Sequence, residues 1–394
     1  MKWWKMMPLR IVIFSLIGVM AMFGCSEESE DNGDSQTNPG TVSGLPADPG
    51  QGNFAGKVVG TVYGKALPSL TVTIGSRSTI TAKDGTFRLD GVGSGNLSVI
   101  VSGSGIYRRT KMINTATDGR SVGIDAIETG GTFNLRFYRE LARGNHPLED
   151  DIFQTHRWMT QPTFYINTNA AAALDGVIDQ TTINTVTRVL KEICPVFTGQ
   201  VYTNVRVQTI YLPLKMSFSE IPDNGFVISF DDSLKNQGAY GITYTEPDFV
   251  SPFTSTVSKA ALFLLDNERF YKTGNAANIA FEEIIAHESG HGFGFRHTSE
   301  ISRGGIPSVM YKTNEYGGIF SVHDELHMFI VYHRPPGNTD VDNDPVSGSA
   351  KAIADSSQIF VDERATTPVD AATQQQLQAL EGFSMTRDAV ASEE

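Results

Sequence analysis

The chain has 394 residues, 40% of them hydrophobic, which suggests two or three domains with ordinary apolar cores. Its formal net charge of −13 argues against nucleic acid as a partner, because nucleic-acid-binding proteins carry basic patches. The two cysteines, Cys25 and Cys194, are not expected to pair, since Cys25 has another expected fate, so the fold must stand without disulfide bonds.

Residues 1–25 have the pattern of a secretory signal. A basic start precedes an almost wholly apolar run, residues 11–23, which is too short to span a bilayer well. The run ends at Gly24-Cys25, and a small residue before a cysteine resembles a bacterial lipoprotein signal, with Met22 where that signal prefers leucine. The resemblance implies cleavage before Cys25, a lipid on Cys25 and a membrane anchor. A plain signal peptide with a chance cysteine is the alternative.

Residues 26–52 begin with acidic side chains and continue as a mixture of Gly, Ser, Thr and Pro. This composition cannot bury a core, so we expect a flexible acidic tether. Acidic residues directly after the lipidated cysteine resemble the surface-export signals of some Gram-negative lipoproteins. The two resemblances imply an exported lipoprotein of the outer membrane, with display on the cell surface as a further expectation.

Residues 53–128 contain short alternating segments separated by glycine turns. Strands are predicted at residues 57–62, 70–75, 86–89 and 97–101, and together they predict a small all-β sandwich. The order G-x-V…P-x-x-x-V-x-I…D-G-x-F-x-L…G-x-L-x-V resembles the carboxypeptidase regulatory-like, transthyretin-like module. We expect a spacer or docking module, and a carbohydrate- or protein-binding role is the alternative.

Residues 135–335 mix strand and helix patterns. Apolar residues at helical spacing predict a helix over residues 179–197, with Asp179 as its cap and Gly199 as its stop. A later helical segment is expected at residues 324–332. Strands are expected at residues 158–166, 205–211, 225–230, 240–244 and 260–265. The mixture predicts an α+β domain.

The pattern H-E-x-x-H-x-x-G-x-x-H runs from His287 to His297, on a helix expected to start near Asn275 or Asn278. Residues four apart lie one helical turn above each other, so His287 and His291 can bind one metal ion.

Glu288 lies beside the face that carries these histidines, close enough to take a proton from a water on the metal. Gly292 and Gly294 are expected to end the helix, so that the chain turns back and presents His297 as a third ligand. Three nitrogens leave the fourth zinc position free, as a catalytic site requires.

This pattern resembles the zinc signature of the metzincin metallopeptidases. A second motif, Ser308-Val309-Met310-Tyr311, fits the methionine-containing turn that underlies the metal site in that family. The resemblance implies a metzincin-like α+β catalytic domain in residues 135–335 that holds one catalytic Zn²⁺. It implies an endopeptidase acting on protein or peptide substrates, in which zinc polarises the scissile carbonyl. Glu288 activates the water and then passes the proton to the leaving amine.

Three other interpretations stay open. In gluzincins the third ligand is a glutamate, and Glu315 or Glu325 lies far enough downstream, although His297 has the better spacing. A surface adhesin or a glycan- or protein-binding lipoprotein could use zinc only to hold its fold, but a structural site normally closes with a fourth residue. Ordinary helix histidines, with Met310 as core filling, would leave the ligand spacing unexplained.

Several further residues with metal-binding or reactive side chains are assigned structural roles. His323 and His327, four apart, could bind a second metal, but no third ligand is obvious nearby, so a solvated helix is expected. Cys194 is expected to be a buried apolar filler rather than a nucleophile.

Residues 336–394 are expected to form a polar tail. Three alternating aspartates between residues 340 and 344 are similar to the start of a calcium loop. Pro345 stands where that loop needs glycine, and Lys351 where it needs glutamate, so we reject a calcium site.

Overall fold

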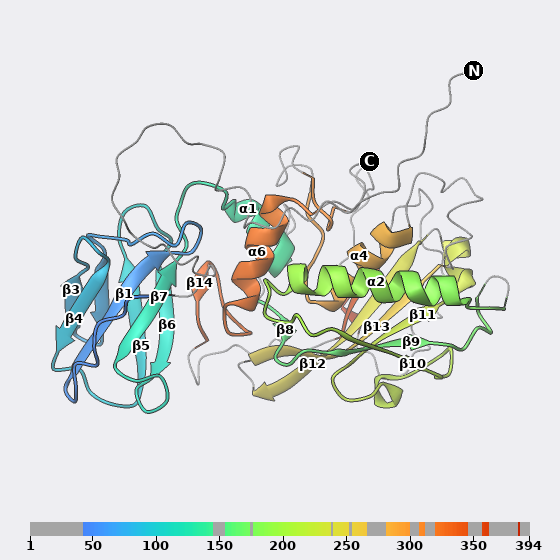
Figure 1. The fold of residues 1–394 in the computed structure, drawn as a ribbon, viewed down its shortest axis with the longest axis horizontal. Coiled ribbons are helices and arrows are strands. Elements are labelled where there is room, and N and C mark those ends of the chain that lie inside the picture. The colour runs from blue at the N-terminus through green and yellow to red at the C-terminus, as the bar shows by residue number, and fades with distance from the viewer. Residues whose placement is uncertain are drawn as a thin grey trace, which may run out of the picture. The chain divides into compact units, whose positions relative to one another are not determined.

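The computed structural model describes residues 42–144, 154–173, 176–237, 239–251, 254–265, 281–299, 307–311, 320–345, 357–361 and 385–386. All of them belong to one unit, residues 39–394, and Figure 1 shows the order of its elements along the chain. The expected signal with Cys25, the first part of the tether, Glu315 and the expected helix caps Asn275 and Asn278 lie outside the described residues. Among the helices of the described ranges, none combines the length and the apolar composition of a membrane-spanning segment.

Seven strands between residues 53 and 126 build two sheets around one apolar core. One sheet has the order β4-β1-β7, and the other contains β6-β5-β2-β3. Phe54, Val72 and Val99, from both sheets, are buried in the same cluster. The four predicted strands are present, and β3, β6 and β7 add to them. The strands are β1 Asn53–Gly60, β2 Thr71–Ile74, β3 Arg77–Ile80, β4 Thr86–Asp90, β5 Asn96–Ser102, β6 Arg109–Asn114 and β7 Ser121–Ala126.

A further strand of the second sheet comes from far along the chain. β14 (Asp342–Asn343) pairs in parallel with β6, with Asp342 opposite Arg109. Asn338 and Asp342 are fully buried, and Asp344 is only 4% exposed. The segment therefore differs from the polar tail expected there, because the side chains of Asn338, Asp342 and Asp344 enter an interior polar cluster.

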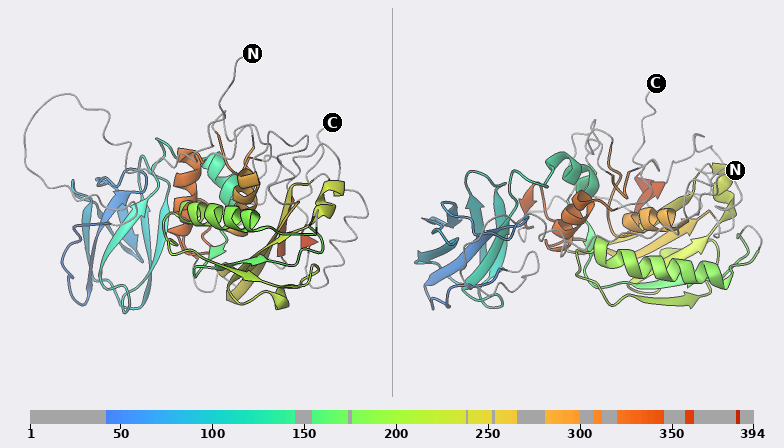
Figure 2. Two further views of the ribbon diagram at one scale, coloured as in Figure 1. Left: turned by 45° about the vertical axis from the view of Figure 1, so that its right-hand side comes forward. Right: turned by 45° about the horizontal axis from the view of Figure 1, so that its top comes forward.

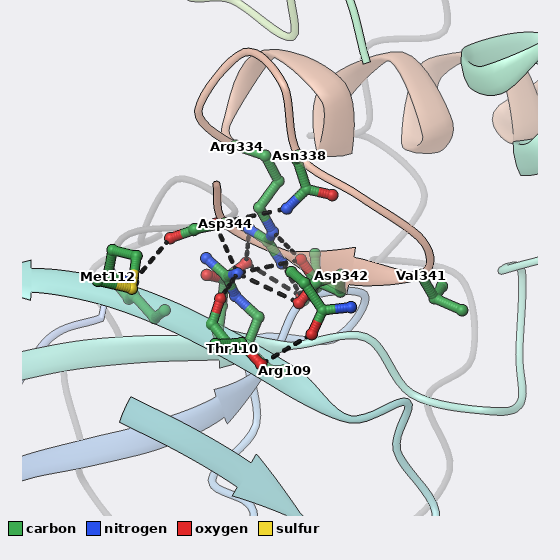
Figure 3. Close-up of polar contacts among 12 residues, drawn as sticks. Arg109, Thr110, Met112, Arg334, Asn338, Val341, Asp342 and Asp344 are labelled. Atoms are coloured by element: carbon green, nitrogen blue, oxygen red, sulfur yellow. Dashed lines mark hydrogen bonds and ion pairs between the residues drawn. The ribbon is translucent and has the colours of Figure 1, made fainter. Parts of the chain in front are cut away.

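That cluster joins the aspartates around β14 to buried arginines (Figure 3). Arg334 donates from Nε to Asp342 Oδ1 at 2.6 Å and from Nη1 to Asp125 Oδ2 at 2.7 Å. Arg109 Nη1 donates to Asp344 Oδ1 at 2.6 Å. Buried charges are stable only when they are paired. The carboxylates at 342 and 344 are thus partners of guanidinium groups.

The third sheet of the described residues is mixed. Its order is β10-β9-β11-β13-β12-β15-β16, and β8 pairs with β13. β10, β9, β11 and β13 are parallel, whereas β12 is antiparallel to β13. All five predicted strands are present, the first of them divided into β8 and β9. The strands are β8 Arg157–Trp158, β9 Thr163–Asn167, β10 Arg206–Ile210, β11 Gly225–Phe230, β12 Gly241–Ser251, β13 Thr254–Leu264, β15 Ser357–Val361 and β16 Met385–Thr386.

Two helices cover one face of this sheet. α2 (Gln180–Phe197) and α4 (Phe281–Gly292) pack against each other, and α4 contacts β12 and β13 (Figures 1 and 2). The predicted cap of α2 is confirmed, since Asp179 Oδ1 accepts from Thr182 N at 2.7 Å. A sheet with helices on one face agrees with the α+β prediction.

Two further α-helices pack against each other, α1 (Leu135–Arg143) and α6 (Val322–Tyr332). α6 begins two residues before its predicted start, because Ser321 caps it. α1 was not predicted from the sequence. Short 3₁₀ helices, η2 Phe218–Glu220 and η3 Asp232–Gln237, lie in the connections of the sheet.

Candidate metal centre

Three imidazoles meet at the C-terminal end of α4. His297 Nε2 lies 3.1 Å from His287 Nε2 and 3.2 Å from His291 Nε2. Their candidate ligand atoms all lie within 4.8 Å of one another. Zn–N bonds of about 2.0–2.1 Å place tetrahedral ligand nitrogens about 3.3 Å apart, so this donor set fits one metal ion. The structure thus brings together the three histidines that the sequence singled out.

Hydrogen bonds orient two of these rings. His287 Nδ1 lies 2.7 Å from Val309 O, and His291 Nδ1 lies 2.9 Å from Phe295 O. A carbonyl oxygen can only accept, so each Nδ1 carries the proton. Each Nε2 then presents its lone pair to the shared point, which is the tautomer that a metal requires.

The chain reverses directly after α4. Gly294 has φ +98°, and a Cβ there would lie 2.4 Å from His156 O, so only glycine fits. Gly292 is different, because it is still helical. A Cβ on it would lie 2.2 Å from the Phe226 ring. The helix ends at Gly292 and the chain reverses at Gly294, as expected, and Gly292 in addition permits close packing on the sheet.

Glu288 is fully buried between α4 and β12. Thr243 Oγ1 donates to Glu288 Oε2 at 2.7 Å and lies 2.9 Å from the backbone oxygen of the same residue. A Cβ on Gly241 would lie 2.4 Å from Glu288 Cγ, so the start of β12 leaves room for the carboxylate. Neither Thr243 nor Gly241 was predicted from the sequence, where the glycine at the start of the strand is the one local signal.

Met310 lies beneath this helix and is fully buried. A Cβ on Gly290 would lie 2.2 Å from Met310 Sδ, so a glycine between His287 and His291 lets the sulfur approach. The same turn reaches the site through its backbone, because Val309 O accepts from His287.

Asp324 of α6 holds that turn. It accepts from Ser308 Oγ at 2.7 Å and from Val309 N at 3.2 Å. Burial raises the pKa of Asp324 to about 6, although the hydrogen bonds from Ser321, Ser308 and Val309 oppose this. α6 therefore supports His287 indirectly, through the backbone of residues 308–310.

A solvated helix was expected for the second histidine pair, His323 and His327, and the structure differs from this expectation. His327 is fully buried, with Nδ1 2.5 Å from His323 O and Nε2 3.1 Å from Asn134 O. Its ring centroid lies 5.0 Å from that of Phe133, and burial lowers the pKa of His327 to about 3. The solvated interpretation is wrong because α1 and its preceding residues cover this face of α6.

The other residues that were considered as metal ligands or as a nucleophile do not belong to this site in the described part of the chain. Neither His323, His327 nor Glu325 belongs to the metal-ligand group found there, and the third position of that group is His297. Cys194 is fully buried, and burial raises the pKa of its thiol to about 12, which confirms it as an apolar filler.

Searches of the sequence against protein-family models and against curated proteins return no match. Function is therefore inferred from the residues of the site.

Proposed function

We propose that this protein is a zinc-dependent endopeptidase of the metzincin type. One observation carries the proposal: three Nε2 atoms converge, and the residue that follows the first of these histidines is a buried glutamate, Glu288, on the same helix as two of them. Three histidines with an adjacent glutamate are typical of a catalytic zinc site, which keeps one coordination position for water or substrate. Among the described residues, no fourth His, Cys, Asp or Glu joins the group.

The residues divide the chemistry between them. His287, His291 and His297 would hold zinc, which when bound supplies Lewis-acid activation of water and of the peptide carbonyl. Glu288 takes the proton of the attacking water and delivers it to the leaving amine. Thr243 orients the carboxylate of Glu288 for both transfers.

Support for the metzincin type comes from two further features. The chain reverses at Gly294 and returns His297 to the other two rings within six residues of His291. Met310 lies under Gly290, at the place where the resemblance expects a methionine turn.

The envelope location is proposed from sequence alone. Cys25 would carry the lipid, and residues 26–52 would tether the enzyme to the outer membrane, facing the cell exterior. Replacing Cys25 by Ser should release the protein from membranes. Protease treatment of intact cells should remove the wild-type chain, and its survival while other surface proteins are lost would contradict surface display.

Cleavage of a diverse peptide library tests the enzymatic proposal. We expect the wild type to bind one zinc ion and to cleave peptides, with activity lost to a chelator and restored by zinc. Glu288→Gln should bind zinc equally but lose about 10²–10⁴-fold in rate, the usual contribution of a general base.

Glu282→Gln is the matched control, because it makes the same chemical change in the first turn of α4, where Glu282 pairs with Arg188. It should cleave as the wild type does. Wild-type rates in Glu288→Gln would remove Glu288 from the mechanism. A folded, zinc-loaded wild type that cleaves no peptide would instead favour a binding lipoprotein with a structural zinc ion.

A further inference from the structure

His297 lies beyond the end of α4, so its position depends on what holds the loop after the helix. Helix α1 supplies acceptors on both sides of it. Arg296 N donates to Leu141 O at 2.9 Å, and Ser299 N donates to Glu140 Oε2 at 2.7 Å. The backbone N–H groups of Arg296 and Ser299, on either side of His297, therefore both donate to acceptors of α1.

Glu140 accepts two hydrogen bonds from Ser299, one at each carboxylate oxygen. Ser299 Oγ donates to Glu140 Oε1 at 2.9 Å, so both carboxylate oxygens bind one residue. Glu140 is only 2% exposed, and hydrogen bonds to an ionised acceptor are stronger than neutral ones. Between these contacts, Thr298 N donates to Met310 O at 3.0 Å. The loop is thus held by α1 on one side and by the methionine turn on the other.

α1 is itself a fixed support. Asn134 caps its start by accepting from the N–H groups of residues 136 and 137, and Gly144 ends it in the left-handed conformation. Arg143 donates to Asn338 O at 2.6 Å and to Asn338 Oδ1 at 2.7 Å. Arg139 pairs with Asp340 at 2.6 Å. The polar segment around β14 therefore anchors the helix that carries Glu140.

We propose that Glu140 is a positioning residue for the third metal ligand. Glu140 binds Ser299 and so fixes the backbone of residues 297–299. This backbone keeps the His297 ring close to the rings of His287 and His291 in the metal-free protein. A preorganised ligand saves the ordering cost that a loose loop would add to metal binding. This role rests on the proposed metal site but not on any peptidase activity.

Zinc affinity of the full chain, measured by competition with a chromophoric chelator, tests this role. Glu140→Ala should weaken zinc binding about tenfold, the lower end of the effect of groups behind a metal ligand. Glu140→Gln should stay within about threefold, because its amide oxygen still accepts from Ser299 N. Arg136→Ala, which removes the exposed partner of Glu140, should change affinity by less than about twofold.

A double-mutant cycle separates positioning from a general structural effect. In a His297→Ala background, Glu140→Ala should leave the residual zinc affinity unchanged, because Glu140 acts on zinc binding only through the position of His297. Should Glu140→Ala fail to fold, Glu140→Met keeps the length and burial of the side chain, and the same double-mutant cycle is measured with Glu140→Met and His297→Ala.

Unaltered affinity in the folded variant, or an equal loss with and without His297, would overturn the role of Glu140. A wild type that binds no zinc would instead overturn the metal site itself, so the two failures are distinguishable.

Discussion

The hydroxyl of Thr243 lies 2.7 Å from Oε2 of Glu288, although the two residues are 45 positions apart in sequence. It also lies 2.9 Å from the backbone oxygen of Glu288, so one side chain of β12 touches both the side chain and the main chain of the helix residue. This contact restricts the buried carboxylate of Glu288 to one preferred orientation against β12.

We expect Thr243→Val to lower kcat about tenfold to hundredfold. Valine has nearly the same shape but cannot donate, and a hydrogen bond to a charged group contributes about 1.5–3 kcal/mol. Zinc content should not change, and Thr243→Ser should keep most of the activity. Steady-state peptide hydrolysis with parallel zinc analysis measures this, and wild-type turnover in Thr243→Val would show that the contact does not orient Glu288.

Gly290→Ala should lower the free energy of unfolding by about 1 kcal/mol. Alanine in a helix interior gains about 1 kcal/mol over glycine, but overpacking a buried site costs about 1–3 kcal/mol. The new Cβ would lie 2.2 Å from Met310 Sδ and 2.9 Å from Phe197 Cε1, so we expect the second effect to win. Denaturant unfolding of the metal-free protein measures the difference.

Met310→Ala supplies the control for that substitution, because it removes the sulfur that the new Cβ meets. In this background Gly290→Ala should cost less than in the wild type, and the difference is the coupling between the two residues. A Gly290→Ala variant that is more stable than the wild type would contradict the close packing of Met310 against α4.

Arg334→Ala should cost about 3–5 kcal/mol of stability. Arg334 is 1% exposed and pairs with Asp125 and Asp342, and removing one partner of a buried ion pair leaves uncompensated charge in the interior. Arg88→Ala removes an exposed pair with Asp90 and should cost less than about 1 kcal/mol. Equal effects of the two substitutions in denaturant unfolding would refute the interior cluster.

Acid should weaken the same cluster. Burial alone would raise the pKa of Asp125, but Arg334 and Arg109 outweigh it and lower the pKa to about 2. The folded pKa lies below the unfolded value of 3.8, so this contribution is complete above pH 4 and is lost as the pH falls towards 2. The shift corresponds to about 2–3 kcal/mol.

Asp125→Asn is the comparison for this pH dependence. The wild type should lose stability more steeply than Asp125→Asn between pH 4 and pH 2, as measured by unfolding free energies across that interval. Parallel curves for the two proteins would mean that the charge of Asp125 contributes nothing to acid unfolding.

Local patterns were sufficient for the apolar framework. α2 forms where its helical periodicity and Asp179 predicted it, and β11 spans the predicted residues 225–230. Helical periodicity identifies α2 because one side of it faces an apolar core, whereas β11 is a continuous, mostly apolar run because both of its faces are buried. Elements with buried polar side chains were harder to predict from the sequence. The side chains of Glu140 and Arg143 in α1 are buried by partners far along the chain, and in sequence they are indistinguishable from charges on a solvated surface.

The sequence by itself determined the set of candidate metal ligands, because two histidines four apart, a glycine that permits reversal and a third histidine are all local features. Only the tertiary structure decided what surrounds that set. Thr243 at Glu288, Asp324 behind His287 and Glu140 beside the His297 loop are polar contacts between distant segments. Such contacts have no sequence period, because each depends on two chain segments that meet only after the apolar core has formed.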